Sequence, residues 1–183
     1  MIISEQKRKS NIAEYVIYMY QIEDVVRAYQ FDIDNIIENF VKPQLPDSSF
    51  LSDYTKWYKA IISNMHSQKI EKVGHLHDVN EVMVELSYLH TTLLNIIKDE
   101  KYTGLFGTAV KFIDEFKDKS NLKDKNHIEI AFHALYMKLL LKVQKKDISP
   151  ESENAFDSMR ILLAYLSKSY HKMKNGELDF VNN

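Results

Sequence analysis

The sequence predicts an all-α protein, a single bundle of six or seven mostly antiparallel helices. Only four glycines and three prolines occur among the 183 residues. Apolar residues recur at helical spacings of three and four, and capping residues stand where several of these patterns begin. No segment shows the alternation of a strand, and no long linker divides the chain. We therefore expect one domain over residues 1–183, with an ordered core of roughly 4–176 and a tail over 177–183.

The first predicted helix runs from Ser4 or Ser10 to about Tyr29. It carries two adjacent apolar stripes, and such a wide apolar face indicates a central position in the bundle. Asp32 can cap a short second helix over residues 33–41. Two prolines follow that helix closely, so we expect it to end there in a loop.

Two further helices are predicted around the middle of the chain. One spans roughly residues 49–69. The next begins near Asp78, which forms the pattern of a capping box with Glu81. Gly104 and Gly107 flank the expected start of a fifth helix, whose polar exit continues to about residue 126.

The last two predicted helices have the clearest signals. The sixth covers about residues 128–143. Ser149 and Pro150 then provide a capping residue and a proline suited to the first helical position. Gly176 is the expected stop of the seventh helix. Its apolar stripe consists of Phe156, Met159, Leu163, Leu166, Tyr170 and Met173.

Composition narrows the cellular compartment and the classes of partner expected for the protein. The chain has no cysteine and a net charge of -2 with both signs interspersed. The lack of cysteine excludes disulfides and thiolate chemistry and suits a reducing, cytoplasmic location. The balanced charge predicts neither nucleic acid nor a membrane surface as partner. We expect a soluble protein without a secretory leader or membrane span, because no apolar run approaches the required length.

The segment from Gly74 to Asp78 contains two histidines in the pattern His-x-His. One hypothesis is a divalent metal centre formed by His75 and His77 and completed by His66, His90 or Asp78. The alternative is a polar helix entrance, in which Asp78 caps the helix and the histidines are solvated or bonded to backbone carbonyls. The alternative is favoured because His-x-His alone is a weak signal. No other cofactor is predicted.

The doublet His77-Asp78 invites comparison with the HD superfamily of helical, metal-dependent phosphohydrolases. That family combines an upstream histidine, a His-Asp doublet and a distal aspartate. Here the upstream histidine, His66, stands too close to the doublet, and the distal acid would have to be Asp114 or Asp118. The pattern therefore departs from that family. The usual nucleotide and serine-hydrolase motifs are also missing, so an enzyme is the less favoured reading.

Glu23 falls on an apolar stripe of the first predicted helix, with Arg27 four residues later. Such spacing favours a helical ion pair, and a structural Glu23–Arg27 pair is the simpler interpretation. The other interpretation is a small-molecule site inside the bundle, formed by Tyr18, Glu23 and Arg27.

Eleven tyrosines and nine phenylalanines are many for this length. Aromatic side chains with a polar tip suit half-buried positions and protein interfaces. Together with the lack of a catalytic motif, they favour a non-enzymatic binding or regulatory module that binds a protein partner or forms a homodimer. The metal-dependent enzyme and the small-molecule site remain the alternatives.

Several short segments, taken in order and spacing, also carry a resemblance over essentially the full length, which ends near Gly176. These segments are Asn11–Tyr15, Gln21–Asp24, Gly74–Leu76, Leu89–His90, Leu139–Leu141 and Gln144–Ser149. They resemble a bacterial family of helical proteins known only as a domain of unknown function. The resemblance implies a stand-alone bacterial protein of about this size. It implies no activity, ligand or residue role.

Overall fold

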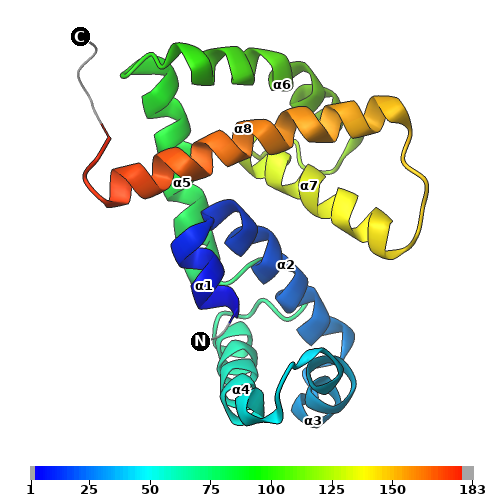
Figure 1. The fold of residues 1–183 in the computed structure, drawn as a ribbon. Coiled ribbons are helices and arrows are strands. Elements are labelled where there is room, and N and C mark those ends of the chain that lie inside the picture. The colour runs from blue at the N-terminus through cyan, green and yellow to red at the C-terminus, as the bar shows by residue number, and fades with distance from the viewer. Residues whose placement is uncertain (1–2, 179–183) are drawn as a thin grey trace.

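Every element of regular secondary structure is a helix in the part that the computed structural model describes, residues 3–178 (Figure 1). No strand occurs within that range, so the all-α prediction is confirmed. It contains eight α-helices instead of six or seven. These are α1 (Ile3–Ser10), α2 (Ile12–Ala28), α3 (Ile33–Ile36), α4 (Leu51–Ser67), α5 (His77–Asn95), α6 (Glu100–Lys119), α7 (His127–Val143) and α8 (Pro150–Lys174). Beyond Leu178, the predicted tail lies outside the described residues.

Asn11 divides the first predicted helix into α1 and α2. Its backbone is extended, with φ at -155°, and its side chain accepts a hydrogen bond from the backbone N–H of Glu14. An asparagine that caps a helix in this way replaces a helical bond with a side-chain bond. The two predicted starts, Ser4 and Ser10, therefore both fall in α1, and the long helix begins after Asn11.

The second predicted helix changes its winding along its length. Asp32 caps α3, as predicted, by accepting bonds from the backbone of Asp34 and Asn35. The chain then widens into a π-helix over Ile37–Val41 and tightens into a 3₁₀ turn over Lys42–Gln44. This turn contains the first of the two prolines, which has no N–H to continue a helical ladder.

One predicted helix cap and one predicted helix start are wrong. Asp78 does not cap α5, because the helix begins one residue earlier and its N-cap is Leu76, which makes no side-chain cap bond. The fifth predicted helix is α6. It begins before Gly104, at Glu100, because Asp99 caps it by accepting a hydrogen bond from the backbone N–H of Tyr102. Gly104 and Gly107 lie on the exposed face of α6, where an added Cβ would meet nothing within 4 Å.

The last two helices follow their sequence signals closely. Asn126 and Glu129 form a reciprocal capping box at the start of α7. Ser149 caps α8, and Pro150 occupies its first position, as predicted. Gly176 follows the end of α8 with φ at +72°, a left-handed conformation that glycine adopts easily.

Most other helix ends use left-handed residues that are not glycine. Five positions have φ between +53° and +63°, and they follow α2, α4, α5 and α7. They are Gln30, Phe31, Lys69, Lys98 and Lys145. Such a conformation costs a non-glycine residue roughly 1–2 kcal/mol, so tertiary contacts have to hold these turns.

One continuous core joins the helices. In Figure 1, α8 runs across α5 and along α6 and α7, while α2 lies between this layer and the end formed by α3 and α4. Helix α2 packs against α1, α5, α7 and α8, so its predicted central position is confirmed. Among the described residues, no helix is long and apolar enough to cross a membrane.

The buried stripe of α8 offers a test of this packing. Leu163 is 1% exposed, whereas Ile161 on the same helix is 44% exposed. Leu163→Ala is expected to lower the free energy of unfolding by about 2–5 kcal/mol, because it leaves a cavity in a close-packed core. Ile161→Ala should cost less than about 1 kcal/mol, because that side chain already meets water. Urea unfolding followed by circular dichroism measures both, and equal losses would contradict the packing.

Candidate functional site

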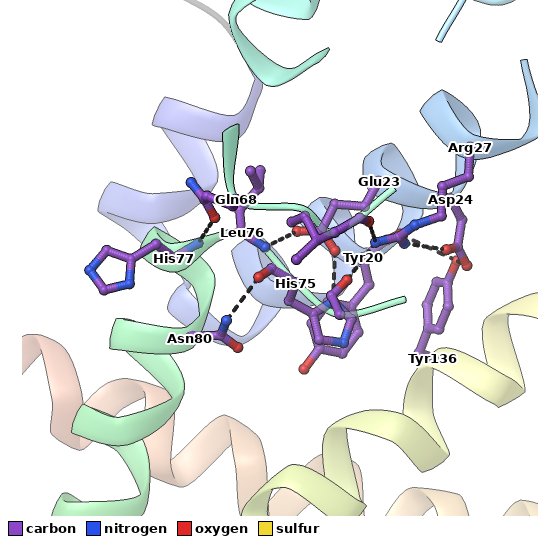
Figure 2. A network of polar contacts seen from close by, with 12 residues as sticks. Tyr20, Glu23, Asp24, Arg27, Gln68, His75, Leu76, His77, Asn80 and Tyr136 are labelled. Atoms are coloured by element: carbon purple, nitrogen blue, oxygen red, sulfur yellow. Dashed lines mark hydrogen bonds and ion pairs between the residues drawn. The ribbon is translucent and has the colours of Figure 1, made fainter. Parts of the chain in front are cut away.

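Glu23 on α2 faces the segment that joins α4 to α5, and its side chain is completely buried, at 0% exposure. Its Oε1 accepts a hydrogen bond of 2.8 Å from the backbone N–H of Leu76. Its Oε2 lies 2.6 Å from Nδ1 of His75 (Figure 2). A carboxyl group that is shielded from water needs hydrogen-bond partners inside the protein, and here each of its two oxygens has a partner. The carboxyl group that the sequence places on an apolar stripe therefore has a defined environment.

Arg27 lies one turn further along α2, but its partners differ from the expected one. Its Nη1 bonds to Asp24 at 3.0 Å, and its Nη2 donates to the backbone carbonyls of Ile70, at 3.1 Å, and Gly74. No ion pair joins Arg27 to Glu23 among the described residues. The predicted structural pair is therefore wrong, because each of these side chains reaches across to the α4–α5 segment.

The α4–α5 segment, residues 68–76, is shaped to meet these two side chains. Gly74 has φ at +103°, and an added Cβ would stand 3.3 Å from the side chain of Ile70. Only glycine fits such a turn without strain. Side chains close the segment at both ends: Gln68 accepts from the backbone of His77, and Asn80 donates to the carbonyl of His75.

His75 stacks on Tyr20 of α2, with ring centroids 3.7 Å apart and an angle of 15° between the planes. His133 of α7 completes the group, 5.8 Å from His75 and 5.5 Å from Tyr20. Burial, followed by the nearby His75, lowers the pKa of His133 to about 4. His133 is therefore neutral at pH 7.

Asp24, at the exposed edge of this group of contacts, connects α2 to α7 through a hydrogen bond. The hydroxyl of Tyr136 donates to Asp24 at 2.7 Å, so Asp24 binds both Tyr136 and Arg27 (Figure 2). Burial and the carboxylate of Asp24 raise the pKa of Tyr136, which keeps its donating proton at neutral pH. One turn of α2 thus contacts both the α4–α5 segment and α7.

The chemistry available at this network is that of an oriented imidazole. The contact with Glu23 fixes the orientation of the His75 ring, and general bases are commonly held in this way. Among the described residues, however, no side chain forms a hydrogen bond to Nε2. The contacts of Glu23, Arg27 and His75 described above join α2 to the α4–α5 segment, and we call them the latch.

The three residues of the predicted small-molecule site are not brought together. Tyr18 lies on another face of α2, where its ring stacks on Trp57 at 6.4 Å. Glu23 and Arg27 bond to the α4–α5 segment instead. Burial raises the pKa of Tyr18, which is therefore uncharged in that aromatic cluster.

The histidines of the predicted metal site also separate. His75 turns inward to Glu23, whereas His77 is exposed and pairs with Glu81 at 3.2 Å. His90 lies between α5 and α6, where its Nδ1 meets the hydroxyl of Tyr102 at 2.7 Å. Within residues 3–178, no three His, Asp or Glu side chains are arranged to hold a metal ion. His66, one of the residues considered to complete the site, pairs with Glu71.

Four participants were missed in the sequence: Tyr20, Asp24, His133 and Tyr136. Asp24 carried a usable signal, because it stands three residues before Arg27, a helical pair spacing. Tyr20 and Tyr136 looked like two of many aromatic residues. His133 had no signal, because its neighbours in space come from α2 and from a segment more than fifty residues away.

The buried carboxylate predicts a large stability loss on truncation. Glu23→Ala leaves the N–H of Leu76 and Nδ1 of His75 without their acceptor, and should lower the free energy of unfolding by about 3 kcal/mol. Glu38→Ala removes only a surface pair with Lys42 and should cost less than about 1 kcal/mol. Chemical denaturation compares the two variants. Similar losses would mean that Glu23 does not organise the segment.

The buried histidines predict a loss of stability in acid. The folded-state pKa values of His133 and His90 are both lowered to about 4, chiefly by burial, against 6.5 for the ordinary group. Between these values the unfolded chain binds protons that the folded chain does not, so stability falls as the pH drops from about 6.5 towards 4. Replacing both by glutamine should flatten this part of the profile. An unchanged slope of unfolding free energy against pH would contradict the assignment.

Comparison with known proteins supports the resemblance seen in the sequence. The chain belongs to the family described as Domain of unknown function (DUF4924), whose model matches residues 1–177. Neither the curated proteins nor the solved structures contain a match to this chain.

Proposed function

We propose that this family member is a non-enzymatic helical binding module whose first partner is a second copy of the same chain. We place it in the bacterial cytoplasm, as a soluble protein. Its cysteine-free sequence suits a reducing compartment, and the resemblance was to a bacterial family. The observation that carries the proposed dimer is an uncovered apolar surface on α7.

The second half of α7 is apolar on nearly all sides. Between Leu135 and Val143 only Lys138 and Lys142 carry a charge. A helix that is apolar all round is normally buried all round. Here Met137 is 45% exposed and Val143 67% exposed. The exposed side of this half-helix thus has the composition of a contact surface.

A groove beside α7 continues this surface onto α6 and α8. It has a volume of about 370 Å³. Its apolar lining comes from all three helices and comprises Phe112, Phe116, Met137, Leu141, Phe156 and Met159. Phenylalanine and methionine are enriched at protein interfaces, and apolar patches rimmed by charge typically mark docking sites.

Charge favours a second copy as the occupant. The end of α7 is basic, with Lys142 and Lys145 exposed, and the rim of the groove contains the carboxylate of Glu151 beside the ion pair of Glu115 with Lys119. In an antiparallel pairing of two α7 helices about a two-fold axis, the basic end of one copy approaches Glu151 of the other. Such an interface is self-complementary, as two-fold symmetry requires. Helix α7 supplies both the protruding side chains and part of the groove.

Molecular mass in solution tests the proposal. Sedimentation equilibrium should give twice the 21.5 kDa of one chain for the unaltered protein. Val143→Glu and Met137→Glu should each shift the protein to the monomer, because they place a charge in the apolar contact. Val84→Glu is the matched control, since Val84 is 69% exposed on α5, away from the groove.

The folded state of each variant is checked by circular dichroism, and all should retain the helical signal because each altered side chain is exposed. An unaltered chain that stays monomeric over the micromolar range would overturn the proposed dimer. Dissociation by Val84→Glu alone would place the interface elsewhere and equally contradict the α7 surface.

A further inference from the structure

A second cavity lies at the opposite part of the fold, between α1, α2, α4 and α5. Its volume is about 230 Å³, below the range typical of pockets for drug-sized ligands. It shares no helix with the groove of the proposed dimer, so an inference about it is independent of that proposal.

One side of the cavity is apolar and aromatic. Tyr15 and Met19 come from α2, Trp57 and Ile61 from α4, and Val79 from α5. Met19, Ile61 and Val79 are almost completely buried, so they form a firm wall. A wall of this kind binds the apolar body of a ligand by excluding water from it.

The opposite side carries charges of both signs. Arg8 and Glu5 come from α1, and Asp78 from the first turn of α5. The guanidinium of Arg8 lies 5.4 Å from the centre of the Tyr15 ring and 3.9 Å from the carboxylate of Asp78. That separation is too long for a hydrogen bond. Arg8 and Asp78 therefore both keep capacity for a third, polar group between or beside them.

Ser4 adds an unused hydroxyl to the same cavity. Its side chain lines the cavity, is only 5% exposed and forms no hydrogen bond among the described residues. A hydroxyl that lines a cavity without a protein partner can donate to, or accept from, a polar group placed there. Ser4 lies one turn of α1 before Arg8 and can donate to a group that the guanidinium also binds.

The geometry points to a binding site for a small zwitterion with an apolar body, an α-amino acid with a large apolar side chain. Its carboxylate is bound by Arg8 and the hydroxyl of Ser4, its ammonium group by Asp78 and Glu5, and its side chain by the wall at Trp57. A ligand with only a positive charge would face Arg8, and one with only a negative charge would face the two carboxylates. Only a ligand with both charges complements both the cationic and the anionic side chains of the cavity.

Isothermal titration calorimetry with leucine and phenylalanine tests the site on the full-length protein. Trp57 is the single tryptophan of the chain, so its fluorescence reports on the same cavity. Saturable binding of at least one of the two amino acids is expected. 3-Methylbutylamine and 4-methylpentanoate, which each keep one charge of leucine, should bind at least about tenfold more weakly, a difference of roughly 1.4 kcal/mol.

Variants separate this site from other surfaces. Arg8→Gln and Asp78→Asn should each weaken amino-acid binding about tenfold or more, since each removes a charge-assisted contact to the ligand. Lys9→Gln is the matched control, because Lys9 follows Arg8 on α1 but lines a different cleft. All three positions are exposed, so their thermal unfolding should stay close to that of the unaltered protein.

Three results would overturn the inference. The first is no saturable heat of binding for either amino acid at millimolar concentration. The second is equal affinity for leucine and one of its single-charge analogues, which would leave the second charge without a role. The third is binding that survives both Arg8→Gln and Asp78→Asn, which would place the ligand outside this cavity.

Discussion

A carboxylate that is completely buried has to be surrounded by donors, and this requirement organises the centre of the protein. Glu23 has no access to water, and its two oxygens bind the backbone of Leu76 and the ring of His75. These contacts fix where the α4–α5 segment ends and α5 begins. Helix α5 in turn packs against α2, α7 and α8. The cost of burying one charge is therefore offset by a specific arrangement of segments far apart in the sequence.

The same latch separates two surfaces of different character. On one side of it, α1, α2, α4 and α5 enclose a small cavity with charges of both signs. On the other side, α6, α7 and α8 form an open groove that is mainly apolar. Helix α2 lines the cavity and packs against α7, which forms part of the groove. The two surfaces thus use different helices for contact but share one rigid element for support.

Local signals in the sequence predicted local structure well. Helix α8 follows from Ser149, its apolar stripe and Gly176, because all of these act within a few residues. The start of α6 differs from the prediction, because the glycine signal at Gly104 competes with a cap at Asp99, and Asp99 forms the cap. At the candidate site the sequence placed Glu23 on an apolar stripe but offered only Arg27 as its partner. The real partner, His75, lies 52 positions away, and no local spacing can reveal such a contact.

The left-handed helix ends described above have a consequence for the evolution of the chain. Gln30, Lys69, Lys98 and Lys145 are exposed and all occupy backbone conformations in which glycine would be relaxed. The rest of the fold enforces these turns, so each one holds a small amount of strain that selection has not removed. A protein kept only as stable as it needs to be can accumulate such positions. They form a reserve of simple, surface-located changes by which relatives could adapt to heat without altering either the core or a binding surface.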